Sequence, residues 1–181
     1  MESRLNKIYK EKVVPALMAE FGFKNVMQVP KIKKVTVNVG YGRFIKDGAY
    51  IENVTKTLTV ITGQKPVHNK TTKSISNFKI REGNEIGVSV TLHGKRMYDF
   101  LDKMANIVLP RVKDFRGISP KSFDKQGNYS IGFKEQLPFA EVKSDAVNKI
   151  HGLQVVITTS AKNKEQGLAL LKMIGFPFRD K

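Results

Sequence analysis

The residues that most often carry out covalent chemistry lack, in this sequence, the spacing that such chemistry needs. The three histidines, His68, His93 and His151, fall on predicted strand or loop positions and lack the spacing of metal ligands. Residues 76–79 match the pattern S-x-x-K, but that motif needs a helix start and partner motifs that this sequence does not have. We therefore expect ordinary histidines, exposed to solvent or at the edge of the core.

The other candidates for an active site are equally incomplete. Glu135 and Glu141 are two neighbouring carboxylates, but Pro138 between them leaves their mutual geometry open. Residues 40–42, G-Y-G, lack the third glycine of a dinucleotide-binding turn. The chain contains no cysteine, which excludes disulfides, thiolate metal sites and cysteine nucleophiles. The sequence predicts no catalytic residues, no metal and no cofactor.

A basic, hydroxyl-rich stretch over residues 63–83 points to the binding of phosphates instead. It has no acidic residue before Glu82, and its cations are Lys65, Lys70, Lys73, Lys79 and Arg81. Its middle, Asn69–Asn77, is polar and has neither helical nor strand periodicity, so we predict an exposed loop. Such an arm on a folded protein is typical of nucleic-acid binding.

Composition and charge agree with this interpretation. The 181 residues are 40% hydrophobic and include 11 Phe and 5 Tyr, which suits one folded domain over residues 1–181. The net charge is +16, and the windows Phe21–Lys46 and Asn53–Arg81 each hold six Lys or Arg and no acid. Such an excess normally needs a polyanion, nucleic acid before an acidic membrane surface. Since no apolar run approaches the ~20 residues of a spanning helix and no signal peptide opens the chain, we expect a cytoplasmic protein without a membrane partner.

Hydrophobic periodicity predicts the scaffold that positions these residues. Apolar residues at helical spacing predict helices over about Ser3–Glu20, Gly48–Thr62, Lys95–Val108 and Lys164–Ile174. Pro15 should kink or restart the first of them. Other apolar patterns predict strands over Ile32–Gly40, Lys65–Asn69, Ile86–His93, Tyr129–Phe133 and Val155–Thr159. The segment Arg111–Asn128 is loop-rich and long enough to suggest a function, and residues 176–178 are expected to pin the tail to the core.

This order of elements predicts an α+β fold, a split β-α-β (RRM-like or ferredoxin-like) antiparallel sheet with helices on one face, plus terminal helices and the basic loop. The face without helices would present Lys34, Thr36, Asn38, Ser89, Thr91 and His93, with Gln64 at its edge. A polar, open sheet face is typical of RNA-reading proteins of this topology. Because the paired aromatic residues of an RNA-recognition motif are missing, we expect recognition of structured RNA by shape and backbone.

Blocks of residues from about Leu5 to the end of the chain resemble one family. They are M-Q-V-P (27–30), N-V-G-Y-G (38–42), T-G-Q-K-P (62–66), N-F-K-I-R (77–81), P-R-V-K-D-F-R-G (110–117), G-N-Y-S (127–130) and F-P-F-R (176–179). In this order they resemble the bacterial large-subunit ribosomal protein five family. The chain departs from the usual family pattern at Asn69, where a small hydroxyl residue is common, at Thr72, which is often basic, and at Ala140, where proline is usual.

The resemblance implies a structural protein that binds 5S ribosomal RNA and helps fix it in the central protuberance of the large subunit, next to large-subunit ribosomal RNA and neighbouring ribosomal proteins. The open sheet face would be the platform, with Asn38, Gln64 and Thr91 hydrogen-bonded to the RNA. Around them we expect contacts from Lys33, Lys34, Thr36, Gly40, Gly42, Lys65, Lys70 and Ser89.

The resemblance also implies two other partners. The basic loop would reach transfer RNA in the peptidyl site through Thr72, Lys73, Ser74, Ile75, Ser76, Asn77, Phe78, Lys79 and Arg81. A small-subunit head protein would meet an inter-subunit bridge formed by Arg111, Lys113, Asp114, Phe115, Arg116, Glu135 and Glu141.

Two alternatives of other classes stay open at the level of sequence. One is a free RNA chaperone or translation factor, which would show little preference among RNAs. The other is an enzyme acting on RNA, which would need an acid–base or metal set that includes Glu135 or His93.

Overall fold

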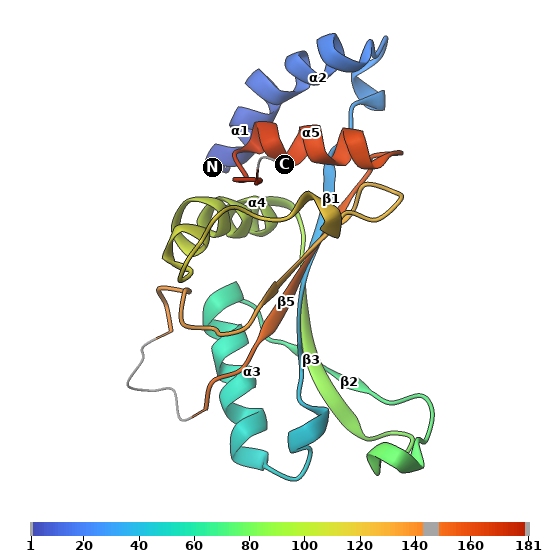
Figure 1. Cartoon of the computed structure of the whole chain (residues 1–181), viewed down its shortest axis with the longest axis vertical. Coiled ribbons are helices and arrows are strands. Elements are labelled where there is room, and N and C mark those ends of the chain that lie inside the picture. The colour runs from blue at the N-terminus through green and yellow to red at the C-terminus, as the bar shows by residue number, and fades with distance from the viewer. Residues whose placement is uncertain (1, 143–148, 180–181) are drawn as a thin grey trace. The chain divides into compact units, whose positions relative to one another are not determined.

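The computed structural model describes residues 2–142 and 149–179, and the chain in it folds into two compact units (Figure 1). The first unit takes residues 1–35, 92–131 and 155–181, and the second takes residues 36–91 and 132–154. Each unit is therefore built from segments that are far apart in the sequence. A single domain over the whole chain stays a prediction.

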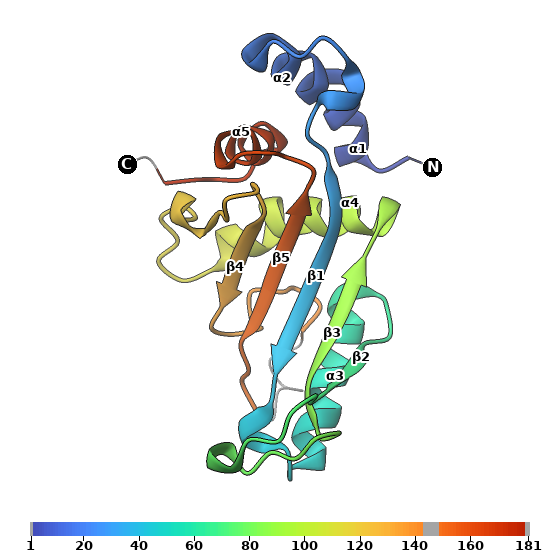
Figure 2. The ribbon, with the colours of Figure 1, turned by 90° about the vertical axis from the view of Figure 1, so that its right-hand side faces the viewer.

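A five-stranded antiparallel sheet in the order β2-β3-β1-β5-β4 runs through the chain, as the alternating arrows of Figure 2 show. The strands are β1 (Ile32–Gly40), β2 (Val67–Lys70), β3 (Glu85–Leu92), β4 (Tyr129–Phe133) and β5 (Leu153–Thr159). β3 returns beside β1, and β5 lies on the other side of β1, which is the split β-α-β arrangement. The predicted α+β fold class is thereby confirmed.

In the second unit, α3 (Gly48–Thr62) lies along one face of β1 and β3 (Figures 1 and 2). Its start is capped by Asp47, whose side chain accepts a hydrogen bond from the backbone nitrogen of Tyr50 (3.1 Å). Its end is Gly63, which adopts a left-handed backbone (φ +66°) and donates from its nitrogen to the carbonyl of Thr59. Both ends match the prediction because both signals are local to the sequence.

In the first unit, the predicted helix over Ser3–Glu20 is present as α1 (Arg4–Ile8), a π-helical turn (Tyr9–Val13) and α2 (Val14–Phe21). The π-helical turn stands directly before Pro15, at the start of α2. A proline lacks the N–H that an inner helical turn would use, so a wider turn absorbs the break without ending the helix.

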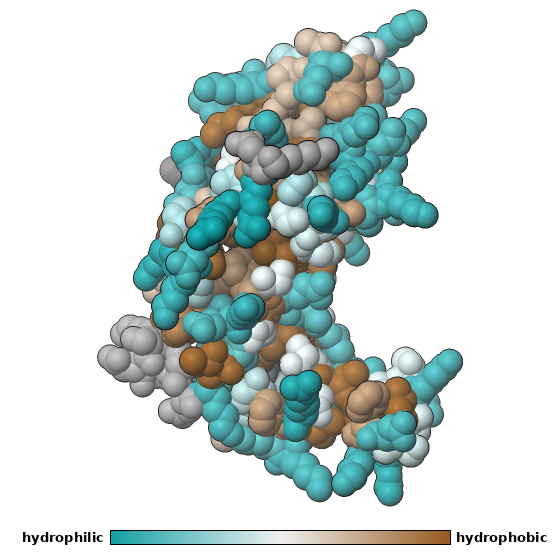
Figure 3. Space-filling view, viewed as in Figure 1, coloured by the Kyte–Doolittle hydropathy of each residue, from teal (hydrophilic) through white to brown (hydrophobic). Residues whose placement is uncertain are grey.

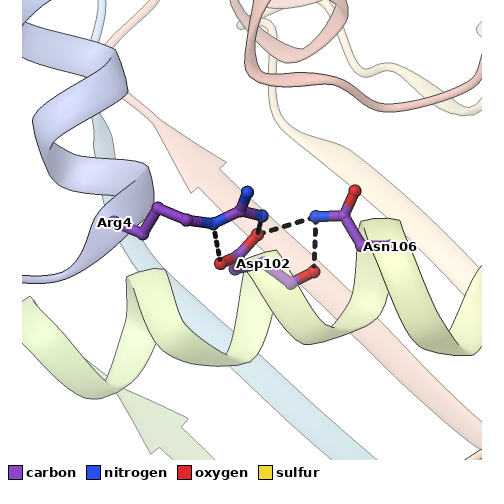
Figure 4. A network of polar contacts seen from close by, with 3 residues as sticks. All are labelled: Arg4, Asp102 and Asn106. Carbon is purple, nitrogen blue, oxygen red and sulfur yellow. Dashed lines mark hydrogen bonds and ion pairs between the residues drawn. The ribbon is translucent and has the colours of Figure 1, made fainter.

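The other helices of the first unit are α4 (Gly94–Lys103), which continues through a π-helical turn over Met104–Val108, and α5 (Lys164–Ile174). A polar network joins α1 to α4 (Figure 4): Nε of Arg4 donates to Asp102 (2.9 Å), and the Asn106 amide donates to the same carboxylate (2.7 Å). The Arg4–Asp102 pair connects the N-terminal helix to α4, and Asn106 orients the carboxylate, although an exposed pair of this kind contributes little free energy by itself.

The loop-rich segment before β4 is ordered by the tail of the chain. The backbone nitrogen of Ile118 donates to the carbonyl of Pro177 (2.8 Å), and the nitrogen of Arg179 donates back to the carbonyl of Ile118 (3.0 Å). The rings of Phe123, Tyr129 and Phe178 form one cluster with centroids 4.5–5.8 Å apart. The prediction that the tail is pinned to the core is confirmed, and the tail in turn anchors the segment.

Asp124 organises the turn that leads into β4. Its carboxylate accepts hydrogen bonds from the backbone nitrogens of Gln126 (2.9 Å) and Asn128 (2.7 Å) and from the Asn128 amide (2.7 Å). Burial by itself would raise the pKa of Asp124, but the hydrogen bonds from Asn128, Gln126 and Gly127 outweigh it and hold the pKa below its ordinary value.

Asp124→Asn should therefore destabilise the protein at pH 7 and much less at pH 3. A carboxyl group with a lowered pKa stabilises the folded state above its ordinary pKa of about 3.9, and the effect is lost as the pH falls through the lowered value. Urea unfolding at pH 7, 5, 4 and 3 measures this, with Asp99→Asn, an exposed position on α4, as the control. A midpoint difference that is the same at every pH would contradict the prediction.

Candidate RNA-binding face

The face of the sheet opposite α3, within the second unit, carries half-exposed polar side chains. On β1, Val37 and Val39 are buried while Thr36 and Asn38 between them are half-buried. On β3, Val88 and Val90 are buried while Ser89 and Thr91 are half-buried, and all four valines are at most 1% exposed. Alternate side chains of a strand point to opposite faces, so the four predicted polar residues, Thr36, Asn38, Ser89 and Thr91, share one face.

Asn69 belongs to the same face, although sequence reasoning did not include it in the platform. β2 pairs antiparallel with β3 so that Val67 lies opposite Ser89, which puts Val67, Asn69 and Ser89 on one side. The Ser89 hydroxyl donates to Oδ1 of Asn69 (3.1 Å). That bond orients the Asn69 amide group on the open face. The sequence could not assign Asn69 to a face of the sheet, because the four residues of β2 show too little alternation.

Gln64 is held at the end of β3, beside Thr91. Its side-chain amide lies 3.4 Å from the backbone carbonyl of Thr91, to which it donates. The Thr62 hydroxyl bonds to both the nitrogen and the carbonyl of Gln64 (3.3 and 3.2 Å), which fixes the backbone just after α3. The structure thus brings together Gln64 and Thr91, which are 27 residues apart in the sequence.

Two glycines shape this face where β1 and β3 approach each other: Gly87 is buried, whereas Gly40 is exposed. A Cβ atom at Gly87 would lie 2.9 Å from the carbonyl oxygen of Val39, so only glycine allows β1 and β3 to approach so closely. Gly40 is exposed and has open space above it, and Gly42 begins the short turn that follows. The exposed glycines Gly40 and Gly42 let a ligand backbone come close to the protein backbone.

The predicted phosphate-binding lysines are exposed but are distributed between the units. Lys65 precedes β2 and Lys70 is its last residue, both in the second unit. Lys33 and Lys34 follow Ile32 at the start of β1 and belong to the first unit. Because alternate residues of a strand face opposite sides, Lys34 is expected on the same side of β1 as Thr36 and Asn38. Lys33 is expected on the side of the buried valines.

The basic loop is an ordered hairpin arm, which we define as residues 71–84. Thr71 and Asn84 are joined at its base (2.8 Å), and Ile75 and Ile80 exchange two backbone bonds (2.9 and 3.2 Å) around a short 3-10 turn. β2 also extends to Lys70, so the prediction that the exposed loop begins at Asn69 was wrong by two residues. The two extra residues pair with β3, a contact that local polarity does not reveal.

Every side chain from Thr72 to Lys79 is exposed. Phe78 is 71% exposed and Ile75 is 44% exposed, and hydrophobic atoms lie among hydrophilic ones over this arm in Figure 3. Lys79 adopts a left-handed backbone (φ +53°), which closes the turn. The arm therefore presents cations and apolar groups together on a framework held by its own hydrogen bonds.

The predicted bridge residues do not lie in one unit. Arg111, Lys113, Asp114 and Arg116 are exposed in the first unit, and Phe115 between them is half-buried. Glu135 and Glu141 are exposed in the second unit.

The histidines lie in separate environments. Nδ1 of His68 is 3.1 Å from the hydroxyl of Tyr41 and 3.4 Å from the carboxylate of Glu85. His151 is buried, and burial lowers its pKa, while His93 is exposed just before α4. Within residues 2–142 and 149–179, no three His, Asp or Glu side chains gather as a metal site would require. The same residues contain no helix long and apolar enough to span a membrane.

Comparison with known proteins accounts for nearly the whole chain. Residues 25–81 match the family described as ribosomal protein L5, and residues 85–178 match the ribosomal L5P family C-terminus. The chain belongs to the ribosomal protein L5 family. It is 52% identical to large ribosomal subunit protein uL5 of Thermoanaerobacter sp. (strain X514), over 97% of this chain and 98% of that protein. It is 51% identical to uL5 of Colwellia psychrerythraea, over 99% of each chain, and 53% identical to uL5 of Chloroflexus aggregans, over 99% of this chain and 100% of that protein.

Family membership decides between the classes that the sequence left open. A member of the L5 family is a structural constituent of the large ribosomal subunit and not an enzyme. Its place is the cytoplasmic ribosome, in association with ribosomal RNA. The resemblance seen in the sequence blocks is confirmed.

Proposed function

We propose that the open face of the second unit binds 5S ribosomal RNA and helps attach it to the large subunit. The observation that supports this most directly is that Asn38 and Thr91 share one polar face, with Gln64 held beside Thr91 at the end of β3. Asn69 and Ser89, joined by a hydrogen bond, extend that face toward the edge strand β2. Donors and acceptors held on strands suit the recognition of one RNA surface because their positions are set before binding.

The platform combines two kinds of contact. The amide and hydroxyl groups specify which RNA is bound, and the exposed glycine Gly40 admits its sugar–phosphate backbone. Lys34, Lys65 and Lys70 add phosphate affinity that does not depend on sequence. Neutralising about 6 phosphates would make the logarithm of the binding constant fall with the logarithm of salt concentration with a slope near −5.

The test is a salt-dependent binding titration of the full chain against 5S ribosomal RNA and against a matched RNA duplex. We expect tighter binding to 5S RNA at every salt concentration, with similar slopes for the two RNAs. Equal affinity for both RNAs would remove the specific proposal and leave only general attraction to phosphates.

The hairpin arm is proposed to contact transfer RNA in the peptidyl site. Its exposed Lys73 and Lys79 lie in the connection between β2 and β3, outside the strands that carry the platform. The framework of hydrogen bonds within the arm lowers the entropy that would be lost when these side chains meet an RNA.

Lys73→Ala should leave 5S RNA affinity within about twofold and weaken transfer-RNA binding to the peptidyl site about threefold or more, because one phosphate contact is lost. Filter binding to reconstituted ribosomes measures the second quantity. Lys56→Ala, which removes an exposed lysine from α3, is the matched control and should change neither. A loss of 5S binding in the Lys73 variant would place the arm in the platform instead.

The exposed charges of residues 111–116, together with Glu135 and Glu141, are proposed to face a small-subunit head protein as an inter-subunit bridge. Both signs of charge are present. Residues 111–116 carry three basic side chains and one acidic side chain, and Glu135 and Glu141 are two carboxylates. Exposed mixed charges suit a contact that must form and break, since they steer association without a large apolar core.

A further inference from the structure

The turn over residues 23–28, between α2 and β1, exposes two neighbouring large apolar side chains. Met27 is 81% exposed, the most exposed large apolar side chain among the described residues, and Val26 beside it is 57% exposed. In Figure 3 hydrophobic atoms lie among hydrophilic ones over α2 and the turn after it, at the top of the view. Nothing proposed so far makes use of this turn, which belongs to the first unit.

Hydrogen bonds hold the backbone of the turn that exposes Met27. The Asn25 side chain accepts a hydrogen bond from the backbone nitrogen of Met27 (2.8 Å). The nitrogens of Gln28 and Val29 donate to the carbonyls of Asn25 and Val26 (3.0 and 3.1 Å). These bonds form one 3-10 turn. The backbone that carries Val26 and Met27 is therefore ordered, with both side chains exposed, before any partner binds.

Both ends of the turn are anchored. Before it, the rings of Phe21 and Phe23 stack with centroids 5.8 Å apart. After it, Val29 and Pro30 are buried. The backbone nitrogen of Lys31 donates to the Ser160 hydroxyl (2.9 Å), and the backbone nitrogen of Ser160 donates to the carbonyl of Lys31 (2.8 Å). Unfolding of the turn would break this packing, so its exposed surface is a stable feature of the first unit.

The charges around the turn select the class of partner. Lys24, Lys31 and Lys33 are exposed, and no carboxylate occurs between Glu20 and Asp47. In a protein–protein interface, such cations would usually be paired with carboxylates next to the apolar groups. Cations without carboxylates, arranged around apolar side chains on an ordered backbone, fit RNA, whose phosphates meet lysines while an exposed base or ribose meets the apolar surface.

We propose that residues 23–31 form a second RNA-binding surface, separate from the open sheet face, in which Met27 and Val26 pack against an unstacked base or ribose of large-subunit ribosomal RNA and Lys24 and Lys31 bind the flanking phosphates. Methionine suits this contact because its flexible, polarisable side chain adapts to a flat ring. The proposal uses the ribosomal identity of the chain and does not depend on the assignment of the sheet face to 5S RNA.

The cysteine-free sequence allows a direct test. Met27→Cys introduces a single thiol, which is labelled with a short photoreactive maleimide in the full chain, assembled into large subunits and illuminated. We expect a covalent adduct to ribosomal RNA and at least tenfold slower alkylation of the unlabelled thiol in the subunit than in the free protein. Val60→Cys, on an exposed position of α3 (53% exposed), reports the background.

An adduct mainly to a ribosomal protein would overturn the proposal in favour of a protein contact. An alkylation rate unchanged by assembly would overturn it as well, because the turn would then face solvent. A second measurement uses affinity: Met27→Ala should weaken binding to large-subunit RNA about fivefold, while Val60→Ala changes it less than twofold, consistent with loss of part of one buried apolar side chain. The 5S titration tests the sheet face separately, so failure of either proposal leaves the other standing.

Discussion

Gly167→Ala should lower the free energy of unfolding by about 2 kcal/mol, the largest stability effect we expect from adding a single methyl group to this chain. A Cβ atom at Gly167 on α5 would lie 2.9 Å from the Cα and 3.0 Å from the carbonyl carbon of Gly127. Both neighbours are backbone atoms, which cannot move aside as the end of a flexible side chain can. Alanine would favour the helix by about 1 kcal/mol, and the overlap must exceed that gain.

Gly127 cannot shift easily to relieve the overlap. It has a left-handed backbone (φ +77°), and its carbonyl accepts a hydrogen bond from the Thr159 hydroxyl (3.0 Å). Urea unfolding followed by circular dichroism measures the effect. Gly132→Ala is the control, because φ at Gly132 is not left-handed and a Cβ there meets no atom within 4 Å. Equal stabilities of the two variants would show that α5 moves away from the β4 turn at no cost.

Asn38→Ala and Thr91→Ala should each weaken binding to 5S ribosomal RNA by roughly tenfold or more, since one well-placed hydrogen bond to a nucleic acid contributes about 1–3 kcal/mol. Binding to an unrelated RNA of the same length should change less than twofold, because neither side chain carries charge. Both side chains are half-buried and project from central strands whose buried valines stay in place. The substitutions therefore remove contacts from the open face without opening the core.

The comparison rests on two controls. Thr91→Ser keeps the hydroxyl and should retain most of the affinity, whereas Thr72→Ala removes a hydroxyl from the exposed arm and should leave 5S binding unchanged. Affinities are measured by filter binding at two salt concentrations, because uncharged contacts should leave the salt slope as it is. If Asn38→Ala lowered affinity for both RNAs equally, the sheet face would not be the specific platform.

Much of the scaffold could be predicted because its signals are local. The ends of α3 follow from Asp47 as a cap and Gly63 as a left-handed stop, and β1 follows from valines at every second position. The same alternation predicts that Thr36, Asn38, Ser89 and Thr91 share one face. The family resemblance rested on short blocks in order, which are likewise read directly from the chain.

The boundaries of β2 could not be predicted in the same way. The strand begins after Pro66, which has no N–H for the ladder, and it ends at Lys70 with an irregular register opposite Glu85. The polarity of Asn69 and Lys70 favours a loop, but their pairing with β3 overrides that preference. A short edge strand depends on its partner more than on its own residues.

By itself, then, the sequence determined the element order, the polar face of the central strands, the excess of positive charge and the family. Only the tertiary structure decided which residues meet: Asn69 with Ser89, Gln64 with Thr91, and Gly127 with Gly167. It also decided that Met27, two residues before buried Val29, is exposed. The physical reason is that periodicity and capping act over a few neighbouring residues, whereas contact and exposure depend on strand register and on packing between distant segments.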